Sequence, residues 1–205
     1  MTRFASLLAA SLLVACSGMR SPQRADVYDL GPPPARLTDV ERWSGVALET
    51  RLPYWFDSLT IEYRLLYDEP LRLRSYAASR WAASPAQMLE QRLRQQLGLS
   101  AARGRNANTC RLRIELQEFS QVFATPQRSS ALLQGQATLL DTRQRIIAEK
   151  AVAVEQPASS ADARGGVGAM VAASGQLGNE LLPWLYEVEK RGRLKSCRVT
   201  TEQQE

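Results

Sequence analysis

Alternation of apolar and polar residues between Cys110 and Gln117 is the feature of this sequence that most restricts its fold. The apolar positions are Cys110, Leu112, Ile114 and Leu116, and charged or amide side chains lie between them. Successive side chains of a strand point to opposite faces of a sheet. The segment therefore predicts a strand with one buried face and one polar face.

Five further segments have strand patterns, and short turns join four of them into two hairpins. The expected strands are Gly45–Leu52, then Leu59–Leu65 hairpinned to Leu71–Tyr76, then Ser130–Leu140 hairpinned to Arg145–Val154. In the first hairpin, Leu59, Ile61, Tyr63 and Leu65 are expected to share the buried face. These patterns favour a mostly antiparallel sheet.

Two segments have helical periodicity instead. Ser84 can cap a helix that starts at Pro85, and Gly98 can end it. Its apolar stripe is formed by Ala86, Leu89, Leu93 and Leu97, with Gln91, Arg92, Arg94 and Gln95 on the opposite face. A longer amphipathic helix is expected over about residues 160–189, where glycines allow close packing. The predicted fold class is α+β, an α/β sandwich in which two amphipathic helices pack on the sheet.

The amino terminus has the order of an export signal. Arg3 precedes an apolar run from Phe4 to Leu13, which is too short to span a bilayer. The run ends in Leu13-Val14-Ala15-Cys16, which resembles the lipobox that precedes cleavage and acylation of a cysteine. We therefore expect a signal peptide at 1–15 and lipidation at Cys16. Ser17 follows in place of Asp, which by the sorting rule of enteric bacteria indicates the outer membrane, facing the periplasm.

The mature chain is expected to comprise a lipidated tether at 16–26, one domain at 27–190 and a polar C-terminal tail at 191–205. The formal net charge of +5 comes from arginines scattered along the strands, so nucleic acid is not an expected partner. The chain contains no histidine, which removes an imidazole base and histidine metal ligands. Neither an enzyme nor a cofactor is expected.

Cys110 and Cys197 are the cysteines left once Cys16 is acylated. An even pair in an oxidising compartment favours a disulfide. Two separate buried thiols remain the alternative, because the sequence does not show how close the two α carbons lie.

Particular residues carry a resemblance to a known family over nearly all of the mature domain. They are Tyr28-Asp29-Leu30, Leu52-Pro53-Tyr54-Trp55-Phe56-Asp57, Ile61-Glu62-Tyr63-Arg64, Tyr76, Arg80-Trp81-Ala82 and Pro85. Their order, behind a lipobox and before a glycine-rich helix, resembles the ABC-type transport auxiliary lipoprotein family, which includes the lipoprotein of the paraquat-inducible system. The resemblance implies a non-catalytic outer-membrane partner of an MCE-type lipid transport complex, with an MCE-domain protein and the membrane as its partners.

The role as a partner that docks the transport complex to the membrane is called the adaptor. Two alternatives to it stay open: a lipid carrier with a groove between sheet and helices, and a stand-alone structural envelope lipoprotein. Self-association into a homo-oligomer is a further open alternative. The residues expected to contact the partner are Tyr54, Trp55 and Phe56, because three adjacent aromatics after Pro53 cannot all point into one core. Trp81 and Trp184 are expected in the core.

Overall fold

The sheet is organised around one long strand, β6 (Cys110–Thr125), which is paired on both edges. The antiparallel strand β7 (Arg128–Leu140) follows one edge along its whole length. Two short strands, β2 (Val46–Arg51) and β3 (Thr60–Leu65), share the other edge, and both are parallel to β6. The computed structural model describes residues 24–32, 35–39, 42–43, 45–101 and 110–197.

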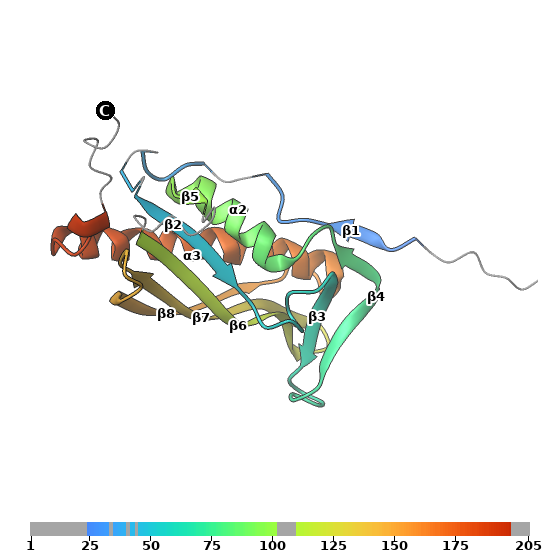
Figure 1. Ribbon diagram of the computed structural model, residues 1–205. Helices are drawn as coiled ribbons and strands as arrows, with labels where there is room; N and C mark the ends of the chain where they lie inside the picture. Colours follow the sequence, from blue (N-terminus) through green and yellow to red (C-terminus); the bar gives the residue numbers. More distant parts are fainter. Residues whose placement is uncertain (1–23, 33–34, 40–41, 44, 102–109, 198–205) are drawn as a thin grey trace, which may run out of the picture.

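Among the described residues, the remaining elements complete one mixed sheet of eight strands, and two helices pack on it (Figure 1). They are β1 (Asp26–Tyr28), β4 (Leu73–Trp81), α2 (Pro85–Leu97), β5 (Ser100–Ala101), β8 (Ile146–Pro157), α3 (Ala163–Lys190) and the 3₁₀ turn η1 (Lys195–Cys197). Both expected hairpins are present, as β3–β4 and β7–β8.

The predicted α+β class with two helices on a mostly antiparallel sheet is confirmed, with a larger parallel component than expected. The antiparallel ladders β3–β4, β6–β7 and β7–β8 contain most of the paired residues. In the described strands, β1 is parallel to β4, and β2 is parallel to both β5 and β6. Parallel pairing joins segments far apart in the chain, and local sequence patterns carry no signal of it.

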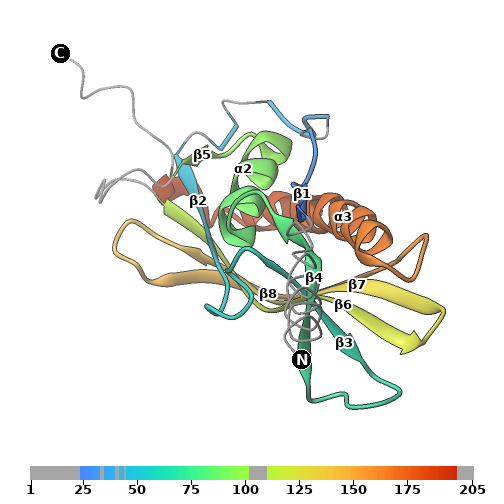
Figure 2. The same ribbon diagram turned by 90° about the vertical axis from the view of Figure 1, so that its right-hand side faces the viewer.

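Both helices lie on the same face of the sheet (Figures 1 and 2). α2 contacts β2, and α3 contacts β7 and β8 and crosses α2. The apolar stripe of α2 is confirmed, since Leu89, Leu93 and Leu97 are fully buried. The predicted caps are confirmed too: Ser84 Oγ accepts the Gln87 amide, and Gly98 ends the helix in the left-handed region at φ 66°.

Arg92 departs from its expected place on the polar face of α2. Its side chain is buried, and Nη1 donates to the carbonyl oxygens of Leu30 at 2.6 Å and Pro32 at 2.9 Å. Burial lowers the pKa of the guanidinium, which stays charged because its usual pKa is so high. Arg92 thereby fixes the N-terminal segment that follows β1 onto α2.

Glycines of α3 permit close approach to neighbouring side chains. A Cβ on Gly178 would collide with Gln96 of α2, and one on Gly166 would collide with Gln121 of β6. Gln96 Nε2 donates to the Gly175 carbonyl oxygen at 2.9 Å, so the crossing of the two helices carries a hydrogen bond as well as packing. The expected close packing of this glycine-rich helix is thus present at particular positions.

Candidate partner-contact surface

The loop between β2 and β3, residues 52–59, interrupts what would otherwise be one continuous strand along β6. From Arg51, paired with Glu115, to Tyr63, paired with Gln121, the chain advances 12 residues while β6 advances six. The extra length must leave the sheet, and it does so as this loop. We call residues 52–59 the aromatic loop.

The three aromatic residues of this loop differ sharply in exposure. Tyr54 is 83% exposed and Trp55 46%, whereas Phe56 is 2% exposed and belongs to the core. The rings form a chain, with centroids 4.9 Å apart between Tyr54 and Trp55 and 6.4 Å apart between Trp55 and Phe56. Of the three residues predicted to contact a partner, Phe56 is therefore buried in the chain by itself, and the exposed pair is Tyr54–Trp55.

A tight turn and a helix cap explain why Phe56 points inward. The amides of Phe56 and Asp57 both donate to the Pro53 carbonyl oxygen at 2.9 Å. Asp57 Oδ1 then accepts the Ala86 amide at 2.9 Å, in the first turn of α2, where helical amides have no partner within the helix. The aromatic loop is thus fixed at its end to a rigid element, which lowers the cost of ordering its backbone when Tyr54 and Trp55 bind a partner.

A charged cluster lies on the sheet face opposite the helices, next to the aromatic loop. Glu49 of β2 pairs with Arg51 at 2.6 Å, Arg113 at 3.1 Å and Arg111 at 3.3 Å. Burial alone would raise the pKa of Glu49, but hydrogen bonds and charge from Arg51 and Arg113 outweigh it and leave the pKa below its usual value. At neutral pH the Glu49 carboxylate is ionised and is surrounded by three guanidinium groups, of which that of Arg51 also lies 3.7 Å from Glu115.

The aromatic loop is also joined to the far half of β6. The Arg64 guanidinium lies 5.8 Å from the centroid of the Phe56 ring, and its Nε donates to Glu118 Oε1 at 3.1 Å. Phe56 is therefore covered on one side by a paired cation rather than by solvent. Sequence patterns did not indicate this contact, because the residues lie on separate strands.

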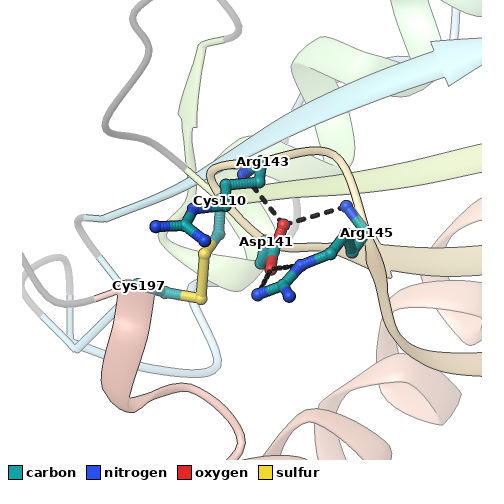
Figure 3. The surroundings of a disulfide bond; sticks show 5 residues. All are labelled: Cys110, Asp141, Arg143, Arg145 and Cys197. Carbon is teal, nitrogen blue, oxygen red and sulfur yellow. Dashed lines mark hydrogen bonds and ion pairs between the residues drawn. A yellow bond between two sulfur atoms is a disulfide. The ribbon is translucent and has the colours of Figure 1, made fainter.

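Cys110 and Cys197 are bonded in the structure, with their α carbons 5.2 Å apart (Figure 3). The bond joins the first residue of β6 to η1, beyond the end of α3. Beside it, the β7–β8 turn is held by Asp141, which accepts the Arg145 amide at 2.9 Å and Nε at 2.8 Å. These hydrogen bonds, that of the Arg145 amide foremost, lower the pKa of Asp141.

The packed domain continues past Lys190. Leu194 and Cys197 are 4% and 3% exposed and belong to the core, and Arg193 Nη1 donates to the Ile147 carbonyl oxygen at 2.7 Å. Packing in the described residues thus extends to Cys197, beyond the predicted domain end at 190.

Other predicted positions have mixed outcomes. Trp81 lies in the core at 2% exposure, as expected, whereas Trp184 is only partly buried. Leu59, expected on a buried face, is 47% exposed because β3 begins after it. The predicted signal peptide at 1–15, and Cys16 with the rest of the tether up to residue 23, lie outside the described residues.

A groove between α3 and β8 has a volume of about 460 Å³. Six of its ten lining residues are charged and four are apolar; the residues are Ala148, Glu149, Lys150, Glu180, Pro183, Trp184, Glu187, Val188, Arg191 and Arg193. Within the described ranges, no three acidic or cysteine side chains gather as a metal site, and no helix has the length and apolar character needed to cross a bilayer.

The fold and its surface define an α+β domain that presents an exposed aromatic pair. The chain belongs to the family of ABC-type transport auxiliary lipoprotein components, whose family model matches residues 52–181. It is an auxiliary lipoprotein component of an ABC-type transport system.

Comparison with solved structures agrees on the fold. A crystal structure of a Xanthomonas campestris protein assigned to DUF330 is similar to this chain with a TM-score of 0.65 and 22% identity, covering 81% of this chain and 98% of that one. A crystal structure of an uncharacterized protein is similar with a TM-score of 0.61 and 11% identity, covering 79% and 99%. No curated protein sequence matches the chain.

Proposed function

We propose that this chain is a non-catalytic subunit that docks an MCE-type lipid transport complex to the outer membrane. Membership of the auxiliary lipoprotein family supports a role beside an ABC-type transporter. The lipobox ending at Cys16 supports attachment to a membrane, and Ser17 after it supports sorting to the outer one. The observation that carries the docking role is the exposed Tyr54–Trp55 pair on a loop fixed to α2.

The lipid-carrier alternative has less support. The groove between α3 and β8 is lined mainly by charged side chains, and the apolar stripes of both helices are covered by the sheet. A carrier needs an apolar cavity that can accept acyl chains. Extraction of stoichiometric phospholipid from the purified domain, without a co-purifying MCE-domain protein, would favour the carrier over the adaptor.

The first experiment tests attachment of the lipid at Cys16. Cys16→Ser is expected to leave the precursor uncleaved and to remove the mass of the acyl chains, because the thiol is the site that accepts the lipid. Intact-mass spectrometry of protein from a membrane fraction measures both. Normal cleavage together with retained acyl mass in the variant would contradict lipidation at this residue.

The second experiment tests whether Trp55 contacts the partner protein. Trp55→Ala is expected to weaken binding to an MCE-domain protein by about 2 kcal/mol, roughly 30-fold, because interface tryptophans are frequent hot spots. Trp55 also contacts the ring of the buried Phe56, so circular dichroism and the unfolding midpoint must match those of the unchanged protein. Affinity is measured with the acylated protein in detergent.

Ile146→Ala is the matched control for the docking experiment. Ile146 is 62% exposed and is the first residue of β8, after the β7–β8 turn. It lies level with the start of β6, whereas β3 pairs with the other half of β6. Its truncation is expected to leave affinity unchanged. Equal losses in the two variants would point to general weakening of the surface and count against a contact centred on Trp55.

A further inference from the structure

The turn of the β3–β4 hairpin exposes large apolar side chains that the docking role does not use. Leu71 is 95% exposed, Tyr67 48% and Leu66 47%. Both views place this turn at the far end of the hairpin, pointing away from the two helices (Figures 1 and 2). We call residues 66–72 the hairpin tip.

The charges at the hairpin tip neutralise one another. Arg72 pairs with Glu69 at 2.9 Å, and Arg74 pairs with Asp68 at 2.9 Å and with Glu69 at 3.2 Å. Together with Arg74, which lies just beyond the tip in β4, the two carboxylates and two guanidinium groups balance one another. An apolar, aromatic-bearing surface without net charge suits the boundary between headgroups and acyl chains, where tyrosine is favoured.

The direction of β1 brings the lipid anchor to the same end of the molecule. β1 is parallel to β4 with Asp26 level with Ser79, and β4 starts at the tip with Leu73. The chain therefore enters β1 from the side of the tip. From Leu73 to Ser79 is about 20 Å along β4, whereas the ten residues from Cys16 to Asp26 can span about 33 Å. An acylated Cys16 can thus lie level with Leu71.

We propose that the hairpin tip inserts into the interface of the membrane that holds the acylated Cys16, with Leu66, Tyr67 and Leu71 among the lipid headgroups and upper acyl chains. The proposal rests on lipidation of Cys16 and goes beyond the docking role. Two separate points of attachment set the orientation of the domain on the bilayer, which a tether alone leaves free. The helices and the groove along β8 then face away from that membrane.

A label at Leu71 tests the insertion. Leu71→Cys introduces an accessible thiol, since Cys110 and Cys197 are bonded and Cys16 carries lipid. The acylated full-length mature protein carries an environment-sensitive nitrobenzoxadiazole dye at this position and is reconstituted into phosphatidylethanolamine–phosphatidylglycerol vesicles. Emission is expected to shift to shorter wavelength and to be quenched by phospholipids brominated near the carboxyl end of their acyl chains. Circular dichroism and non-reducing peptide mapping check the fold and the native disulfide.

Ile146→Cys carries the same dye as the control, because Ile146 is exposed at the opposite end of the sheet. The emission of the dye at this position is expected to remain at the wavelength typical of the dye in water. Aqueous emission from the Leu71 position would overturn the proposal, and so would equal quenching at both positions, which means non-specific adsorption. A Leu71 label shielded only after addition of the MCE-domain protein would overturn it in favour of a protein contact. Mass spectrometry of the same sample reports acylation separately, and missing acyl chains would remove the anchor on which the geometry depends.

Discussion

Replacing both Cys110 and Cys197 with alanine is expected to lower the free energy of unfolding by about 4 to 5 kcal/mol. The two residues are 87 positions apart in the chain, and closing so long a loop restricts the unfolded state strongly in the chain-entropy model. The bond also ties η1 to the first residue of the central strand β6. Urea unfolding of the double variant, compared with the oxidised protein, measures the difference.

Reduction supplies the control for this experiment. The unchanged protein in dithiothreitol is expected to unfold at nearly the midpoint of the double variant, because both lack the same constraint. Trypsin is expected to cut sooner near Arg193 and Lys195 in both, since Leu194 and the Arg193 hydrogen bond to Ile147 then hold this segment without the covalent link. Equal midpoints for oxidised and reduced protein would show that the cysteines are unpaired in solution or that native strain cancels the entropic gain.

Local signals in the sequence predicted α2 well. The Ser84 cap, Pro85 in the first turn and Gly98 at the end act through contacts within a few residues, so no distant part of the fold can alter them. Arg92 was misplaced for the opposite reason. Its burial depends on carbonyl oxygens of Leu30 and Pro32, which come from a segment about 60 residues earlier.

The central strand shows how a bulge hides part of a strand from pattern analysis. Residues with even numbers face the helices up to Leu116, but the register shifts between Leu116 and Glu118. Beyond this bulge all five residues from Phe119 to Phe123 are buried, so the alternation of buried and exposed positions ends. The predicted strand therefore stopped at Gln117, whereas β6 continues to Thr125.

The sequence predicts that aromatic residues of the loop are exposed, but not which of the three is buried. Three consecutive aromatics in a loop required that at least one be exposed, and Tyr54 and Trp55 are. That Phe56 is the buried one follows from the turn at Pro53 and the bond from Asp57 to α2, which are tertiary features. The hairpin tip escaped prediction because Leu71 fits a strand pattern and instead lies in the turn before β4.

Gly135→Ala is expected to lower the free energy of unfolding by about 3 kcal/mol, although it adds one methyl group. Gly135 lies in the middle of β7, paired with Leu116 and with Val152, so strands flank it on both sides. A Cβ there would collide with the carbonyl oxygen of Glu115 and the Cα of Leu116, which are backbone atoms beside the β6 bulge. Backbone in the centre of a sheet cannot rotate away as a side chain can, so the strands must separate locally.

Gly168→Ala adds the same group where the structure predicts the opposite sign. Gly168 lies on the exposed side of α3, and its Cβ would meet no atom within 4 Å. Alanine there is expected to raise stability by up to about 1 kcal/mol through helix propensity. Urea unfolding of the two variants side by side measures both changes. A neutral Gly135→Ala would mean that β6 and β7 relax around the bulge at little cost, and the close approach of these strands would then carry no constraint on residue 135.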